Sequence, residues 1–237
     1  MIRTETADEF CKNGFEILKD VLPQSRCDRL AAELSAMHQR QKEAVKRRIG
    51  GVRNLLRLSP QVNDVANSYE VRAILEKRIA KPIFPVRALF FDKTADSNWR
   101  VAWHQDITIA VAERIDAQGF EAWSIKDEIV HVQPPRGILE GMATVRLHLD
   151  DCNASNGALR VVAGSHVEGK LDAAKIGMLS ATENVRVCEI PRGGALLMRP
   201  LLLHASSPAE NPSHRRVLHI EYATEELPNG LKWFERQ

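Results

Sequence analysis

The sequence predicts a mostly β protein, an antiparallel sandwich or barrel with helices packed on its outside. From residue 142 to residue 222, short apolar and β-branched segments alternate with turns, as antiparallel strands do. The first third of the chain instead has apolar residues at helical spacing. No internal repeat, low-complexity tract or linker divides the chain. We therefore expect one domain, residues 1–237, with a helical N-terminal third packed on the β core.

Helix-start signals divide this first third. Thr6-Ala7-Asp8-Glu9 has the spacing of a capping box and predicts a short helix that Asn13-Gly14 ends. Ser25 can cap a second helix. Ser59-Pro60 combines a cap with a first-turn proline and predicts a third helix that runs to about Arg78.

A long segment interrupts the strands that follow. Outside 142–222, the segments that predict strands are 15–18, 85–91 and 98–109. Residues 113–135 form an irregular stretch that is long for a connection within a compact domain, and they carry Trp123, His131 and Gln133. Two interpretations stay open: a lid or binding loop over a site, or a surface insertion with Trp123 against the sheet.

Composition argues against several classes of partner. The chain has 33 basic and 31 acidic residues for a net charge of +2, which gives no reason to expect nucleic acid or a membrane surface as partner. The four cysteines lie far apart without a Cys-x-x-Cys pair, which is typical of reduced thiols in a cytoplasmic protein. No apolar signal core follows the N-terminus, and no run of 18 apolar residues occurs. We expect a soluble, cytoplasmic protein of open oligomeric state.

The segment around Trp103-His104-Gln105-Asp106 carries the first chemical signal. On a strand, His104 and Asp106 project from the same face, about 7 Å apart at the backbone. With a second imidazole from elsewhere they would form the ligand set of non-haem Fe(II), which leaves positions open for substrate and oxygen. His148-Leu149-Asp150 has the same spacing in a similar setting, so spacing alone does not choose between the two.

The second imidazole can come from His204. An apolar strand ends at this histidine, a polar turn follows, and the next strand opens with Arg215-Arg216. If the chain folds back there, an arginine lies beside the His204 strand. Its guanidinium could hold a carboxylate by paired hydrogen bonds next to the metal.

These residues resemble the phytanoyl-CoA dioxygenase-like family, whose members are Fe(II)/2-oxoglutarate oxygenases. Three blocks carry the resemblance: Trp103-His104-Gln105-Asp106; Leu149-Asp150-Asp151 through Asn156-Gly157-Ala158-Leu159 to Gly164-Ser165-His166; and His204-Ala205-Ser206 with Arg215 eleven residues after the histidine. The likeness covers nearly the whole chain, and it implies a double-stranded β-helix, or jelly roll. Ala163 stands where the family usually has proline, which affects a turn and not the chemistry.

The resemblance implies a role for each site residue. His104, Asp106 and His204 would hold Fe(II), while Asp150 would be structural. Arg215 would bind the distal carboxylate of 2-oxoglutarate, and spacing favours it over its neighbour Arg216. The remaining cosubstrate candidates are Ser206, through its hydroxyl, and Thr144, which alternates with Arg146.

The reaction implied by the resemblance uses 2-oxoglutarate and O2 to oxidise an unactivated C–H bond of a small molecule, with release of succinate and CO2. Related halogenases replace the metal carboxylate with a small residue, so Asp106 favours hydroxylation or another oxidation. The candidate substrate residues are Trp123, His131, Gln133, Arg146 and His219.

Two rival functions would make different demands on these residues. A cupin-like metal oxygenase or isomerase that does not use 2-oxoglutarate would leave Arg215 and Ser206 without a task. A non-catalytic jelly-roll binding protein would have no need of three ligands with an arginine beside them, because packing does not demand that combination.

Overall fold

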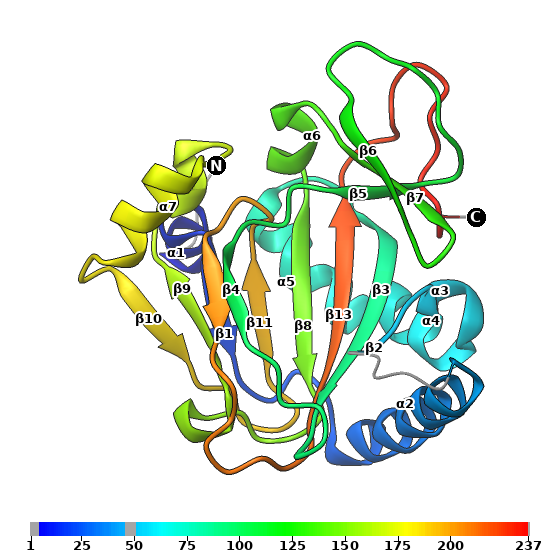
Figure 1. The fold of residues 1–237 in the computed structure, drawn as a ribbon, viewed down its shortest axis with the longest axis vertical. Helices are drawn as coiled ribbons and strands as arrows, with labels where there is room; N and C mark the ends of the chain where they lie inside the picture. The colour runs from blue at the N-terminus through cyan, green and yellow to red at the C-terminus, as the bar shows by residue number, and fades with distance from the viewer. Residues whose placement is uncertain (1–4, 46–50, 237) are drawn as a thin grey trace.

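The computed structural model describes residues 5–45 and 51–236, and within these residues a larger and a smaller antiparallel sheet face each other (Figure 1). The larger sheet has the strand order β1 (Phe15–Leu18), β11 (Ala195–Met198), β8 (Ala143–His148), β13 (Arg215–Ala223), β3 (Phe84–Lys93) and β2 (Gly51–Val52). The smaller sheet has the order β10 (Val185–Cys188), β9 (Leu159–Val162), β12 (His204–Ser206) and β4 (Val101–His104). The arrangement is that of a jelly roll whose sheets do not close into a barrel.

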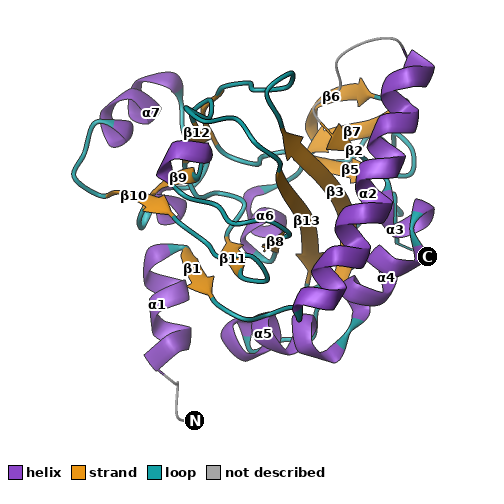
Figure 2. Cartoon of the chain, turned by 90° about the horizontal axis from the view of Figure 1, so that it is seen from below, coloured by secondary structure: helices purple, strands orange, loops and turns teal. Residues whose placement is uncertain are grey.

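Helices cover the outer face of the larger sheet. They are α1 (Glu5–Asn13), α2 (Gln24–Val45), α3 (Leu55–Leu58), α4 (Pro60–Asn67) and α5 (Tyr69–Ile79). In Figure 2, α2, α4 and α5 lie on one side of β3 and β13, and the smaller sheet lies on the other. The helices and the outward residues of these strands share one apolar core, as the amphipathic pattern of the N-terminal third predicts.

Alternation along the central strands separates this core from the interior between the sheets. On β13, Leu218 and Ile220 pack against the helices, while His219 and Glu221 line a cavity on the opposite face. On β8, Val145 packs outward in the same way. Because successive side chains of a strand point to opposite faces, each central strand contributes to both the core and the cavity.

A third sheet replaces the irregular stretch expected over residues 113–135. β5 (Ile109–Val111), β7 (Ile129–Gln133) and β6 (Glu121–Lys126) form this sheet, which lies at the end of the larger sheet beside the C-terminal segment (Figure 1). The expectation of an irregular stretch is wrong because the β6–β7 turn has no glycine. Asp127 and Glu128 adopt positive φ there, of 50° and 63°, and so form the tight turn themselves.

The helical third also differs from expectation in its boundaries. The helix expected from Ser59 to Arg78 is two helices, because Ser68 is extended and ends α4 before α5 begins. Ser59 caps α4 as predicted, since its hydroxyl accepts a hydrogen bond from the Val62 amide. α2 begins at Gln24, so Ser25 lies inside it. The side chain of Thr6, the expected cap of α1, is outside the described residues.

Two short α-helices lie in the C-terminal half, and the second is within residues 142–222, where only strands and turns are expected. α6 (Arg136–Glu140) precedes β8, and α7 (Ala173–Ser180) lies between β9 and β10. Asp172 caps α7 by accepting a hydrogen bond from the Lys175 amide. Across the stretches of chain that the structure describes, no helix combines the length and apolar character needed to span a membrane.

Candidate active site

Three side chains of the ligand type meet at the edge of the smaller sheet. His104 ends β4, His204 begins β12, and the two residues are direct cross-strand partners. One carboxylate oxygen of Asp106 lies 3.7 Å from Nε2 of His104, and the other lies 3.7 Å from Nε2 of His204. One ligand atom from each residue lies within 4.8 Å of the other two. The structure therefore brings the three predicted ligands together.

Asp106 reaches this position from a loop. The strand expected over residues 98–109 ends at His104, and the chain then turns so that the Asp106 amide donates to the carbonyl of Pro200 over 2.9 Å. The expectation that His104 and Asp106 share one strand face is thus wrong, although both side chains still point toward one centre. The contact with Pro200 replaces the strand ladder at this point.

Gln105, between the two ligands, fixes the turn. Its amide nitrogen donates to the carbonyls of Gly169 and Leu201, over 2.8 and 2.6 Å, and its amide oxygen accepts from the amide of Leu171 over 2.8 Å. All three partners are backbone atoms, and the side chain is buried. Gln105 therefore ties the metal-binding turn to two other loops.

The protons of both histidines are placed by backbone carbonyls. Nδ1 of His104 lies 2.9 Å from the carbonyl oxygen of Ala102, and Nδ1 of His204 lies 2.9 Å from that of Leu202. Because a carbonyl only accepts, each Nδ1 carries the proton and donates it. Each neutral ring then keeps its lone pair on Nε2, the atom nearer to Asp106. Two imidazole nitrogens and one carboxylate fit Fe(II).

Burial sets the charge of these ligands. It lowers the pKa of His204 to about 4, so the ring is neutral near pH 7 and able to bind a cation. Burial alone would raise the pKa of Asp106, but the nearby histidine rings, His204 foremost, and Arg146 outweigh it and hold that pKa below its usual value. The carboxylate is therefore ionised near pH 7.

A cavity of about 490 Å³ opens beside the three ligands, lined by residues from both sheets. Arg215 lies on its wall at the start of β13 and donates to the carbonyl of Gly157, while its buried Nε has no partner. Gly157 has φ +82°, and a Cβ there would lie 2.8 Å from the carbonyl oxygen of Ser207. Glycine is thus needed in the turn that positions Arg215.

Ser206 and Lys93 flank Arg215. Lys93 is the cross-strand partner of Arg215, and its buried amine donates to the hydroxyl of Ser206 over 3.0 Å and to the carbonyl of Ser207 over 2.7 Å. Burial, and next to it the charge of Arg215, lowers the pKa of Lys93 to about 8. Since Lys93 occupies a lone pair of the Ser206 hydroxyl, the O–H proton of Ser206 stays free to donate.

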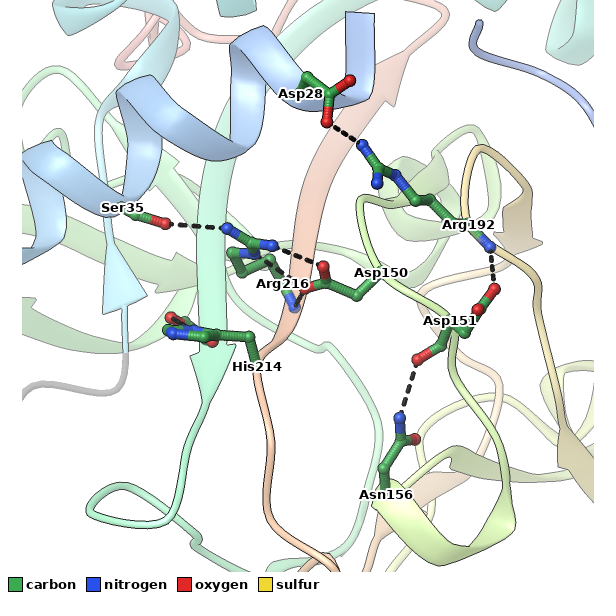
Figure 3. Close-up of polar contacts among 9 residues, drawn as sticks. Asp28, Ser35, Asp150, Asp151, Asn156, Arg192, His214 and Arg216 are labelled. Atoms are coloured by element: carbon green, nitrogen blue, oxygen red, sulfur yellow. Dashed lines mark hydrogen bonds and ion pairs between the residues drawn. The ribbon is translucent and has the colours of Figure 1, made fainter. Parts of the chain in front are cut away.

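Arg216 points away from the cavity. Its guanidinium binds Asp150 over 2.6 and 2.8 Å, and its amide donates to the same carboxylate over 2.9 Å (Figure 3). A further nitrogen reaches Ser35 of α2 at 3.5 Å. Asp150, the acid of the second His-x-Asp motif, is therefore engaged in holding α2 to β13.

The neighbouring acid has a similar structural role. The Asp151 carboxylate accepts from the amide of Arg192, whose guanidinium in turn pairs with Asp28 of α2 (Figure 3). The carbonyl of Asp151 accepts from the side-chain amide of Asn156 over 2.8 Å. The acidic turn therefore fastens the loops around α2.

The cavity gathers most of the predicted site residues. Those that line it are His104, Asp106, Gln133, Arg146, His204, Ser206, Arg215 and His219. Three candidates do not. Thr144 is buried on β8. Trp123 on β6 is partly buried against the apolar cluster of the third sheet, with Arg114 over its ring. His131 is fully buried on β7 with Nδ1 2.9 Å from the carbonyl oxygen of Ile129.

Four cavity residues form a polar chain across the larger sheet. A guanidinium nitrogen of Arg146 on β8 lies 2.8 Å from Nδ1 of His219 on β13. Nε2 of His219 lies 3.4 Å from a carboxylate oxygen of Glu221, which accepts from Arg87 of β3 over 3.1 Å. The guanidinium can only donate, so Nδ1 of His219 accepts and Nε2 carries the proton toward Glu221.

The sequence patterns do not predict roles for three residues near the site, Lys93, Gln105 and Glu221. Glu221 lies two residues after the candidate His219, so strand alternation could have placed it on the same face. Lys93 lies opposite Arg215 on the neighbouring strand, a pairing that the sequence does not show. Gln105 belongs to the block that carries the family resemblance, but its role depends on carbonyls from loops distant in the sequence and cannot be predicted from that block.

Comparison with known proteins identifies the family of the chain. The sequence matches the phytanoyl-CoA dioxygenase (PhyH) family over residues 10–217. A comparison with curated proteins found no match.

Solved structures share the fold. AviO1 from Streptomyces viridochromogenes Tue57 is 23% identical over 96% of this chain and 97% of that chain, with a TM-score of 0.70. EctD from S. alaskensis with bound Fe is 16% identical over 94% and 77%, with a TM-score of 0.71. HygX from Streptomyces hygroscopicus with nickel and 2-oxoglutarate bound is 15% identical over 96% and 91%, with a TM-score of 0.66. The predicted jelly-roll class is confirmed.

Proposed function

The chain belongs to the phytanoyl-CoA dioxygenase family of 2-oxoglutarate-dependent non-haem iron oxygenases, and from this premise we propose that it hydroxylates an unactivated C–H bond of a small molecule at the site formed by His104, Asp106 and His204. The observation that carries the proposal is the meeting of these three side chains at one end of the cavity, with both Nε2 lone pairs free. They would hold Fe(II).

The cosubstrate would bind through Arg215 and Ser206. Arg215 is buried on the cavity wall, and no described carboxylate forms a salt bridge with it. The Ser206 hydroxyl, oriented by Lys93, can donate to the same anion. Arg216 is committed to Asp150, which supports Arg215 as the residue that binds the distal carboxylate of 2-oxoglutarate. Thr144 lies outside the cavity lining and is a weaker candidate for this role.

Bound Fe(II) with 2-oxoglutarate would activate O2, with release of succinate and CO2. The residues of this chain hold the reactants. Gln105 and the backbone of Pro200 fix the turn that carries Asp106. His104 and His204 keep their Nδ1 protons on backbone carbonyls.

Hydroxylation is favoured over halogenation because Asp106 occupies the carboxylate position. A metal enzyme that does not use 2-oxoglutarate is the second candidate. The buried Arg215 counts against it, because it pairs with no described carboxylate and a buried cation is costly unless an anion joins it. A purely binding role would leave three convergent ligands without use.

The proposal extends to the organisation and location of the protein. The helical third and the larger sheet share one apolar core, which supports a single domain. All four cysteines are free, three of them buried, which supports a cytoplasmic protein with reduced thiols.

The test is succinate formation by purified protein given Fe(II), 2-oxoglutarate and ascorbate. We expect slow succinate formation by the wild type even without the substrate, and none by His104→Ala. His148→Ala is the matched control, because it removes the histidine of the second motif, which does not line this cavity.

Two outcomes would decide against the proposal. Equal succinate formation by wild type and His104→Ala would exclude this metal site. Absence of succinate from the wild type, together with absence of 2-oxoglutarate binding in anaerobic calorimetry, would exclude the cosubstrate and favour the metal enzyme that does not use it.

A further inference from the structure

The walls of the active-site cavity carry an excess of positive charge. Its lining includes two carboxylates, on Asp106 and Glu221, against five cationic side chains, which are Arg53, Arg87, Lys126, Arg146 and Arg215. Asp127, which is not among the lining residues, pairs with Arg53. Fe(II) and doubly charged 2-oxoglutarate would cancel one another, so binding both leaves this excess in place.

Arg146 is the most unusual of these cations. It is buried, lines the cavity, and its Nε has no hydrogen-bond partner. Among the described residues, no carboxylate forms a salt bridge with it, and its one hydrogen-bond partner is the neutral acceptor Nδ1 of His219. A guanidinium has five donors, so most of those of Arg146 remain available. Its charge acts on Asp106, and its guanidinium lies 5.7 Å from the centre of the Phe91 ring, but most of its donors can still bind an anion that enters the cavity.

The polar chain on the sheet holds Arg146 in place. Glu221 fixes the proton of His219 on Nε2, which leaves Nδ1 as the acceptor for Arg146. Arg87 pairs with Glu221 and keeps that carboxylate from neutralising Arg146 directly. Three strands therefore orient one guanidinium toward the cavity, without cancelling its charge.

The cosubstrate does not account for this guanidinium. Arg215, Lys93 and Ser206 already form a separate group suited to the distal carboxylate of 2-oxoglutarate. His219, the cross-strand partner of Arg146, lies four residues from Arg215 along β13, or about 13 Å at the usual rise of a strand. The backbones of the two arginines are therefore well separated on the cavity wall, although the charges of their side chains still act on each other.

We propose that Arg146 binds an oxyanion, a carboxylate or a phosphate, on the substrate, and that the enzyme therefore acts on small anionic molecules. His219 and Glu221 are positioning residues for this contact. Arg87 and Lys126, which also line the cavity, add to its positive field. The inference rests on the proposed function and names the substrate class of the same site.

The experiment measures the binding of simple probes by calorimetry. The protein is loaded with Ni(II) and 2-oxoglutarate under anaerobic conditions, so that no turnover occurs. Acetate is compared with acetamide, and benzoate with benzamide, because each pair differs mainly in charge. Inorganic phosphate forms the other arm and distinguishes a phosphate site from a carboxylate site. Wild type, Arg146→Gln and Arg186→Gln are compared, since Arg186 is exposed on β10 and outside the cavity lining.

We expect the wild type to bind at least one of the anions preferentially, because hydrogen bonds to charged groups are the stronger ones. A carboxylate should bind the wild type about tenfold or more tightly than its neutral counterpart does. Alternatively, phosphate should bind the wild type about tenfold or more tightly than it binds Arg146→Gln. Arg146→Gln should lose this preference while its affinity for 2-oxoglutarate stays close to that of the wild type. Arg186→Gln should behave as the wild type. His219→Gln should weaken anion binding less than Arg146→Gln does.

Three results would overturn the inference. The first is that neutral and anionic probes bind the wild type with equal affinity, while the affinity for phosphate is unchanged in Arg146→Gln. Arg146→Gln could weaken 2-oxoglutarate in place of the probes, which would make Arg146 a cosubstrate residue. The third such result is that every probe binds Arg146→Gln as tightly as it binds the wild type. Failure of the wild type to bind 2-oxoglutarate at all would instead contradict the proposed function, and the loading step detects this separately.

Discussion

The two His-x-Asp motifs have the same spacing but lie in different surroundings: His104-Gln105-Asp106 and His148-Leu149-Asp150. In each motif the histidine is the last residue of a strand. His104 faces His204 across two paired strands, with Asp106 beside both rings. His148 is buried with neither ring nitrogen hydrogen-bonded, and Asp150 is held by Arg216. The difference lies in what the opposite strand supplies: an imidazole in one case and a guanidinium in the other. Two residues at this spacing can form a metal site only when a third ligand, here His204, lies beside them.

The largest expected difference between the two motifs is in activity. Asp106→Ala should lower succinate formation by more than about 100-fold, since loss of a partner outside the ligand set already costs about 10–100-fold. Asp150→Ala should keep most of the activity of the folded protein, because Asp150 does not line the cavity. Rates of succinate formation at saturating Fe(II) check this. A strong loss of activity in Asp150→Ala would contradict the prediction if circular dichroism shows that the variant is well folded. A loss of activity that accompanies a loss of secondary structure would not.

The adjacent residues Arg215 and Arg216 should differ in the same way, here in their effect on 2-oxoglutarate binding. Arg215→Gln should raise the Kd of 2-oxoglutarate about 30-fold or more, the effect of removing one partner from a buried charged contact. Arg216→Gln should leave that Kd nearly unchanged, because its guanidinium is bound to Asp150 on the far side of β13. Anaerobic calorimetry with Ni(II)-loaded protein measures both. The opposite ranking would transfer the cosubstrate role to Arg216.

For the free energy of unfolding, the order of the effects should be reversed, with Asp150→Ala more destabilising than Asp106→Ala. Asp150→Ala removes three hydrogen bonds to Arg216 and should lower the free energy of unfolding by about 1–3 kcal/mol, which corresponds to roughly 2–4 °C in Tm per kcal/mol. Asp106→Ala should change the metal-free protein less, since the described contacts of Asp106 are two histidine rings 3.7 Å away. Urea unfolding of the metal-free variants tests this. A larger loss in Asp106→Ala would show that the acid also has a structural role.

The smallest expected effect concerns pH and His148. Burial holds the pKa of His148 well below its usual 6.5, so the unfolded chain binds a proton there more readily than the folded one. The folded state of the wild type therefore loses stability as the pH falls below about 6.5. His148→Leu lacks this penalty and leaves no polar atom unpaired, so its stability relative to wild type should increase from pH 7 to pH 5.5. Urea unfolding at both values measures the difference. An equal change in both proteins would contradict the assignment.

The sequence predicted those regions of the fold and site that depend on local pattern. Strand alternation and the Ser59-Pro60 signal correctly indicate β3 and the start of α4. The pairing of His104 with His204 followed from family resemblance and the order of strand, turn and strand. The substrate candidates Arg146 and His219 line the cavity, whereas Thr144, which alternates with Arg146 on β8, does not.

The features that were missed depend on contacts between distant segments. The Asp127-Glu128 turn lacks the glycine that would have indicated a hairpin, and Ser68 breaks a helix without proline or glycine. Asp106 leaves its strand because Pro200, far along the chain, accepts its amide. Gln105 has a role only when the loops that carry Gly169 and Leu201 are in place. Such effects are determined by tertiary structure and leave no periodicity in the sequence.

The pairing of β4 with β12 has a consequence for folding as well as for chemistry. β4 is a four-residue strand at the outer edge of the smaller sheet, and its partner His204 is a hundred residues further along the chain. Closing so long a loop for so short a strand yields few backbone hydrogen bonds for the entropy lost. A metal held between His104 and His204 would act as a crosslink over that loop, present only in the native state. Metal binding would then stabilise the folded protein by mass action, and amide exchange in β4 should slow when metal is added.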